Sequence, residues 1–544
     1  MPRPHPVDAR PAAVTRDHRS PRGTPPDVAV YREPIAGLHL WQPMPDVAQP
    51  QDLAFPDEAF RADQPAAGEP RPFRLPAMQA FTLASGIEVY LVTQHALPLV
   101  SLDLSFPGGA ALDPVGKEGL ASVCMAMLTE GTEALDKLAY AERLADTASS
   151  IGGYAGDDAV GLTLSSLTKH LAPAFAQLVE TLRTPGFRAS DFERMVKRRI
   201  EGVKQARRSP GSVASRVGSP VLYGAAHPFG AVTTEASLAA LTLDDCKAFA
   251  RRRLVPRHAR LFVVGDLTEP QIRALFDHPA LADWRDDDAD ALPALPAPRT
   301  MPGRIFFVDI PGATQSSVSY LQLGPQRTSP EFFANAMLGA IVGGGFTSRL
   351  NMNLREDKGY SYGARGSFSY TRLIGAFTAS ATVAGNATYQ TIREIDRELR
   401  GLANHAPGFA VTADELEREQ RGAILGLPGR FATAQAALGQ YRALVYFGLP
   451  LAYYESYVER VAAVTADDVM AAAARELAPD DAVYVVVGDG ALPVIVRDGD
   501  HDVPYERHGA PVTLREALAE LAARGDVGPG ALVELDADGR VVVG

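Results

Sequence analysis

Two side chains in the second half of the sequence, Arg355 and Tyr362, are of types that can stabilise negative charge on a bound substrate. A tyrosine hydroxyl donates a hydrogen bond to an oxyanion, and an arginine guanidinium offers a planar fork to a carbonyl or carboxylate oxygen. The pair follows three glycines, at residues 343–345, which favour a turn where chain segments approach closely. On spacing alone, an exposed helical arginine and a packing tyrosine explain the pair better, so its interpretation depends on the surrounding sequence.

That surrounding sequence, GGGFTSRL at residues 343–350 and LREDKGYSYG at 354–363, resembles the second domain of the pitrilysin-type zinc peptidases, the family with the inverted zinc motif. In the family, the glycine-rich turn leads into a helix that ends in an Arg and a Tyr seven residues apart. The resemblance implies that Arg355 and Tyr362 contact the substrate carbonyl opposite a zinc ion. Tyr360 is a rival for the tyrosine role, with a spacing that fits less well. The resemblance also implies substrate contacts by four loop residues: Gly343, Gly344, Gly345 and Phe346.

The zinc motif of that family is missing from the first half of the sequence. The family reads Gly-x-Ala-His-x-x-Glu-His there, with two histidine ligands on one helical face and a glutamate as general base. The matching stretch is GLASVCMAMLTEGT at residues 119–132, where Ser122 and Ala126 replace the histidines and Met125 replaces the base. The third ligand, a glutamate, would fall at Gly202. Because none of these four residues is a usual zinc ligand, we expect no metal in this chain. The resemblance implies that the zinc lies in a partner subunit.

An internal repeat indicates two homologous domains. The segment from Thr242 to Gly265 recurs from Thr465 to Gly488 at a constant offset of 223 residues. Each copy places an N-cap threonine before a short helix and a buried strand that ends in Gly-Asp. Strands clustered beside long helices predict an α+β fold, in which each domain is an antiparallel-rich sheet packed by helices. The resemblance implies the same fold and adds that two such domains form half of a clam-like chamber.

The sequence divides into five expected segments, which are listed in order. They are a Pro-rich N-terminal arm (1–75), a first pitrilysin-like domain with the degenerate zinc site (76–282), a linker (283–303), a second domain with the glycine-rich loop and the Arg/Tyr pair (304–490), and a C-terminal extension (491–544). Within the extension, Thr513 begins a capping box and residues 536–540 predict a hairpin turn.

Composition and charge limit the classes of function. A net charge of −12 argues against a nucleic acid or an anionic membrane as partner. No apolar run approaches the ~20 residues that a membrane span needs. Cys124 and Cys246 are too few for a disulfide framework and are expected to be buried thiols. The first 26 residues lack the hydrophobic stretch of a secretory signal, so we expect a cytoplasmic protein, or a periplasmic one if a signal precedes this sequence.

These patterns lead to one functional expectation and two alternatives. Paired members of the family divide the work, one subunit carrying the zinc motif and the other the Arg/Tyr pair. The resemblance therefore implies a non-catalytic, substrate-binding subunit of a heterodimeric metalloendopeptidase. Such a chain is inactive alone and supplies Arg355 and Tyr362 in trans to a homologous zinc-bearing partner for peptide hydrolysis. The alternatives are a scaffold protein, as with the core subunits of the mitochondrial respiratory complex that resemble this family, and a stand-alone peptide-binding protein.

Overall fold

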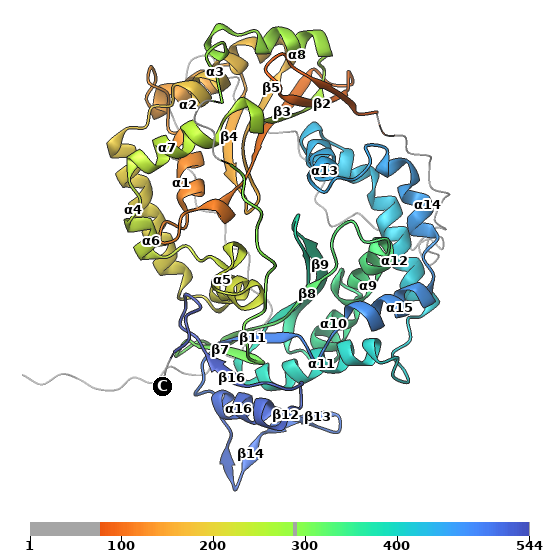
Figure 1. The fold of residues 1–544 in the computed structure, drawn as a ribbon. Helices are drawn as coiled ribbons and strands as arrows, with labels where there is room; N and C mark the ends of the chain where they lie inside the picture. Colours follow the sequence, from red (N-terminus) through yellow and green to blue (C-terminus); the bar gives the residue numbers. More distant parts are fainter. Residues whose placement is uncertain (1–74, 76, 287–290, 543–544) are drawn as a thin grey trace, which may run out of the picture. The chain divides into compact units, whose positions relative to one another are not determined.

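The computed structural model describes Leu75 and residues 77–286 and 291–542, so the expected N-terminal arm lies outside the described residues except for Leu75. Two six-stranded sheets organise this part of the chain (Figure 1). The first contains, in spatial order, β1 (Gln79–Thr82), β2 (Glu88–Thr93), β6 (Arg260–Gly265), β3 (Leu99–Pro107), β5 (Ala159–Leu167) and β4 (Ser150–Ala155). The second contains β16 (Leu532–Glu534), β7 (Ile305–Asp309), β11 (Val483–Gly488), β8 (Gln315–Gly324), β10 (Gly375–Ala384) and β9 (Ser361–Tyr370).

Helices accompany both sheets, as the predicted α+β fold requires. Before residue 300 they are α1 (Leu120–Leu128), α2 (Lys137–Asp146), α3 (Leu171–Arg183), α4 (Ala189–Ala206), α5 (Pro210–Tyr223), α6 (Glu235–Ala239), α7 (Leu243–Arg253) and α8 (Glu269–Phe276). After it they are α9 (Phe332–Gly343), α10 (Arg349–Asn351), α11 (Thr388–Ala403), α12 (Ala413–Gly426), α13 (Ala434–Tyr446), α14 (Tyr457–Ala462), α15 (Ala466–Glu476) and α16 (Leu514–Arg524). No helix in the described ranges is long and apolar enough to cross a lipid bilayer.

The repeat in the sequence is confirmed by the topology of the sheets. β6 and β11, which end at the two repeated glycines, both occupy the third position of their sheet. β6 runs parallel to β2 and antiparallel to β3, and β11 is parallel to β7 and antiparallel to β8. The helices before them, α7 and α15, both begin with a capping box, formed by Thr242 with Asp245 and by Thr465 with Asp468. The two halves are therefore homologous α+β domains.

The C-terminal extension completes the second sheet. β16 adds to β7 in parallel, whereas β1, at the matching edge of the first sheet, pairs antiparallel to β2. Thr513 forms the predicted capping box with Glu516 at the start of α16. The predicted hairpin turn is also present, because Asp536 N donates to Arg540 O at 2.8 Å and Leu535 bridges to Val541. The extension also forms two small antiparallel sheets: β12 (Ile495–Asp498) with β13 (His501–Pro504), and β14 (Glu506–Arg507) with β15 (Ala510–Pro511).

One helix from the first half of the sequence packs on the second sheet. α5 contacts β8 and β11, and its buried Val217 and Val221 share a hydrophobic cluster with Phe306, Val485 and Leu535. The two expected thiols lie in the first half, where Cys124 and Cys246 are both buried and free. Burial raises the pKa of the Cys124 thiol well above its ordinary value. Part of the expected linker, residues 287–290, lies outside the described residues.

Candidate functional site

Arg355 lies on a helix that changes its winding. α10 continues directly into a π-helical turn, Met352–Asp357, which carries Arg355 as its fourth residue. Such turns are rare and occur often at functional sites. The wider turn also changes which side chains share a face, so the direction of the Arg355 side chain depends on this local winding.

Tyr362 lies on a strand, which corrects the prediction that one helix ends in both residues. After the π turn, Gly359 takes a φ of +66°, a left-handed conformation that ends the helix. Tyr362 is then the second residue of β9, which is an edge strand. The pairing of β9 with β10 shifts register between Ala381 and Val383, opposite Tyr362. This irregularity is a β-bulge, a feature that re-aims side chains at sheet edges.

The structure brings Arg355 and Tyr362 together. The guanidinium carbon of Arg355 lies 5.1 Å from the ring centroid of Tyr362 and 4.2 Å from that of Phe346. Both distances are typical of a cation over an aromatic face. Tyr362 is 91% exposed and Phe346 57% exposed, and in the described chain the Tyr362 hydroxyl has no hydrogen-bond partner. The cluster therefore presents a free hydroxyl donor and a cation held between two rings to the outside of the chain.

The rival tyrosine, Tyr360, has its hydroxyl engaged elsewhere. Its side chain is buried, and the hydroxyl donates to Asp502 Oδ1 at 2.6 Å. Burial and the neighbouring carboxylate both raise the pKa of the Tyr360 phenol. Asp502 belongs to β13 of the C-terminal extension, so this bond ties the extension to the segment between the π turn and β9. Tyr360 thus anchors the segment between the π turn and β9, whereas the Tyr362 hydroxyl is free to bind a ligand.

The glycine-rich turn is fixed against β9 by close backbone approach. A Cβ on Gly343 would lie 1.9 Å from the backbone nitrogen of Gly366, and the two residues form an isolated bridge. By contrast, a Cβ on Gly345 would meet nothing within 4 Å. The first glycine is therefore required by packing, whereas Gly345 lies in open space beside Phe346.

Asn351 is a residue of this site that sequence reasoning missed. Its buried amide donates to Gly345 O at 2.7 Å and to Ala364 O at 2.8 Å, and its Oδ1 accepts from Ala364 N at 2.8 Å. The Asn351 side chain on α10 thus joins the glycine turn to β9. Its contact on β9 is Ala364, two residues after Tyr362. The available signal was a polar side chain one helical turn from Ser348 in the GGGFTSRLN stretch, which is too common a pattern to single it out.

The residues at the family's zinc positions do not form a metal site. Ser122 on α1 and Gly202 on α4 line one cavity of about 320 Å³, while Met125 is buried and Ala126 does not line that cavity. Zinc in proteins is bound by Cys, His, Asp or Glu side chains. The serine, methionine, alanine and glycine at these positions offer none of these donors. Among the residues the structure describes, no group of three His, Cys, Asp or Glu side chains is arranged to hold a metal ion. The donor set here does not fit zinc.

Comparison with known proteins relates these features to one family. Residues 89–217 match the family profile described as Insulinase (Peptidase family M16), and residues 240–423 match the one described as Peptidase M16 inactive domain. A Helicobacter pylori protein named non-peptidase homolog YmxG is 23% identical over 389 residues, which cover 69% of this chain and 85% of that protein. The two profile matches together span more than half of the chain.

Solved structures agree in fold over most of the described chain. A peptidase M16 inactive domain from Pseudomonas fluorescens is 26% identical with a TM-score of 0.69, covering 76% of this chain and 98% of that one. A protease from Helicobacter pylori is 17% identical with a TM-score of 0.68, covering 76% of this chain and 100% of that one. The chain therefore belongs to the M16 peptidase family, the pitrilysin-type family that its sequence resembles, and is a homologue of the inactive, non-peptidase members.

Proposed function

We propose that this chain is the non-catalytic, substrate-holding subunit of a heterodimeric zinc peptidase. Its partner is a homologous subunit that carries the zinc motif and the glutamate base. This chain supplies Arg355 and Tyr362 to the shared peptide substrate. The observation that carries the proposal is the free Tyr362 hydroxyl beside the guanidinium of Arg355, in a chain whose own zinc positions hold no metal ligands.

The chemistry of the pair suits an acyl-transfer reaction that takes place on a partner. Attack on a peptide carbonyl places negative charge on its oxygen, and a hydroxyl donor aimed at that oxygen stabilises the charge. The Tyr362 hydroxyl is such a donor, and its side chain is exposed at the edge of the second sheet. Arg355 offers several N–H groups to a neighbouring substrate carbonyl, and stacking between Phe346 and Tyr362 limits its motion. Less side-chain freedom is then lost when substrate binds.

The exposure of the cluster favours this function over a scaffold. Three apolar side chains close together in sequence are at least 41% exposed: Phe346, Met352 and Tyr362. Exposed aromatic groups around a cation contribute little to folding but resemble the composition of binding surfaces. A scaffold gains nothing from keeping the Tyr362 hydroxyl free of intramolecular partners.

The proposal is tested by reconstitution with a homologous subunit that carries the zinc motif. The full chain alone is expected to hold no stoichiometric zinc and to cleave no peptide, as measured by metal analysis and a fluorogenic peptide assay. A mixture of the two subunits should elute as one complex on gel filtration and should cleave peptides faster than the partner alone. About one tightly bound zinc per chain in the isolated protein, or no gain in cleavage on mixing, would contradict the proposal.

A further inference from the structure

A second site is suggested by the cavity that Ser122 and Gly202 line. It lies between α1 and α4, which pack against each other, and has a volume of about 320 Å³. Its charged lining side chains are Arg198, Arg199 and Arg216, and no Asp or Glu side chain lines it. Arg216 is paired with Asp538, but no carboxylate in the lining offsets Arg198 and Arg199. These two guanidinium groups give the wall a positive charge, which favours anions and opposes metal cations.

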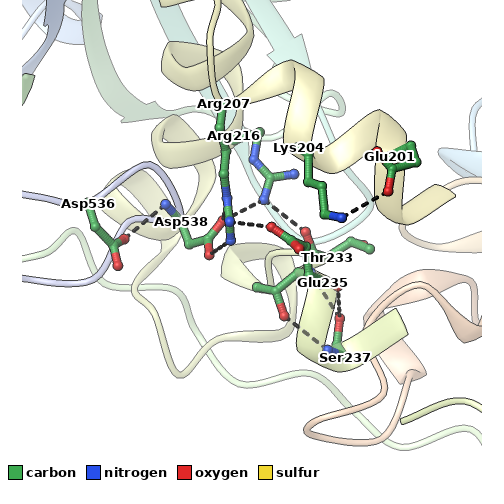
Figure 2. A network of polar contacts seen from close by, with 10 residues as sticks. Glu201, Lys204, Arg207, Arg216, Thr233, Glu235, Ser237, Asp536 and Asp538 are labelled. Carbon is green, nitrogen blue, oxygen red and sulfur yellow. Dashed lines mark hydrogen bonds and ion pairs between the residues drawn. The ribbon is translucent and has the colours of Figure 1, made fainter. Parts of the chain in front are cut away.

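The arginines of this wall differ in whether their guanidinium groups already have polar partners within the chain. Arg216 Nη2 donates to Thr233 O at 2.9 Å and to Asp538 Oδ1 at 2.8 Å, as Figure 2 shows. In contrast, Arg198 and Arg199 form no ion pair or hydrogen bond with any residue that the structure describes. The positive charge of the cavity therefore comes mainly from Arg198 and Arg199, on the face of α4 that also carries Gly202.

Other cationic side chains near this cavity are paired outside it. Lys204 binds Glu201 at 2.8 Å, and Arg207 binds both Glu235 and Asp538 (Figure 2). The carboxylate of Asp538, only 7% exposed, is thus held by Arg207 together with Arg216. This internal ion pair shows that a carboxylate from a hairpin is accommodated by two guanidinium groups beside the cavity, in the fork geometry typical of arginine.

We propose that the cavity between α1 and α4 binds a carboxylate of a peptide, using Arg198 and Arg199. The carboxylate is either the C-terminal group or an Asp or Glu side chain of the peptide. This inference rests on the proposed peptide-holding function and adds a charge preference to it. The volume accommodates one side chain or one terminal residue with a few water molecules, and Ser122 contributes a hydroxyl to the same wall. The cavity then selects acidic peptides, whereas the cluster around Tyr362 contacts the peptide backbone.

Direct binding to the full chain of three fluorescent peptides, which differ only at the C-terminal group and at one internal residue, tests the inference. The first peptide has a free C-terminal carboxylate and an internal Gln, the second an amidated C-terminus and an internal Glu, and the third an amidated C-terminus and an internal Gln. At least one carboxylate peptide should bind about tenfold more tightly than the uncharged third peptide, the size expected for one charge-assisted hydrogen bond. The peptide that gains affinity identifies the source of the carboxylate, and the gain should shrink as salt rises.

Charge-matched variants distinguish binding in the cavity from non-specific attraction between the acidic peptides and positive charge elsewhere on the chain. Arg198→Gln combined with Arg199→Gln should remove the tenfold preference, because both free guanidinium groups are lost. Lys197→Gln combined with Arg208→Gln removes the same charge from exposed positions outside the cavity, and the preference should persist. A Cβ at Gly202 meets nothing within 4 Å, so Glu and Gln both fit there and differ only in charge. Gly202→Glu should therefore weaken the binding of the carboxylate peptides more than Gly202→Gln does.

Three outcomes overturn the inference. Equal affinity of the three peptides for the wild-type chain contradicts the carboxylate preference but leaves peptide holding intact. If the two charge-matched double variants lose the carboxylate preference to the same extent, the preference comes from overall charge and not from the cavity. If none of the three peptides binds, the result contradicts both this inference and the proposed function.

Discussion

Arg355 is the residue whose contacts most constrain the proposed chemistry. Its guanidinium stacks on Phe346 and Tyr362, and its Nε also lies 3.3 Å from Glu356 Oε1. These contacts fix the direction of the side chain while leaving it 30% exposed. Substrate binding can therefore use the remaining N–H groups without reordering the arginine.

We predict that Arg355→Ala mainly weakens substrate capture. In the reconstituted pair, KM should rise about tenfold or more while kcat changes less, because the arginine contacts the ground state as well as the transition state. Arg355→Lys should recover little, since an ammonium group lacks the planar fork that stacks between two rings. Steady-state kinetics give both constants. A fall in kcat with an unchanged KM would instead assign Arg355 to the transition state alone.

The elements around the site show where sequence reasoning ends. Periodicity and capping chemistry predicted the repeated helices and strands, because Thr465 with Asp468 forms a local hydrogen-bond motif that is readable from spacing. The π turn and the β-bulge beside Tyr362 were not predictable in this way. Both depend on how α10, the glycine turn and β9 pack together. Asn351 links these elements through hydrogen bonds to Ala364, which lies 13 residues later in the sequence.

The glycine-rich turn offers a matched pair of substitutions at the element scale. Gly343→Ala should destabilise the second domain by roughly 1–3 kcal/mol or more, because its Cβ would overlap the backbone of Gly366 and force α9 away from β9. Gly345→Ala should change stability by less than about 0.5 kcal/mol, since its Cβ meets nothing within 4 Å. Urea unfolding of both variants measures the difference. Equal stability of the two variants would show that α9 does not pack this closely on β9.

At the scale of the whole molecule, the C-terminal extension joins parts that the sequence assigned to different segments. Its β16 enters the second sheet, its Asp502 holds Tyr360, and its Asp538 binds Arg207 and Arg216 from the first half (Figure 2). The duplication was readable from a constant offset, but these roles were not. The extension lies outside the repeat, so no second copy indicated what it packs against.

The ion pairs of Asp538 predict a dependence of stability on pH. Burial alone would raise the pKa of Asp538, but hydrogen bonds from Arg207 and Arg216 outweigh it and lower the pKa. A carboxyl with a lowered folded-state pKa stabilises the protein above its unfolded value of about 3.9, and this contribution is lost as pH falls through the folded-state pKa. Asp538→Asn should therefore be less stable than wild type at pH 7, with the gap closing below about pH 4. A gap in thermal midpoint that stays constant from pH 7 to pH 3 would contradict this assignment.

The central claim, that this chain donates an oxyanion-stabilising hydroxyl to a reaction on its partner, is tested most directly by Tyr362→Phe in the reconstituted pair. The substitution removes one oxygen from a ring that is 91% exposed, so folding and assembly should be unaffected, as gel filtration can verify. We predict a fall in kcat of about 10²-fold or more with a small change in KM, as expected for the loss of one oxyanion donor. Wild-type kcat in an intact Tyr362→Phe complex would contradict the claim.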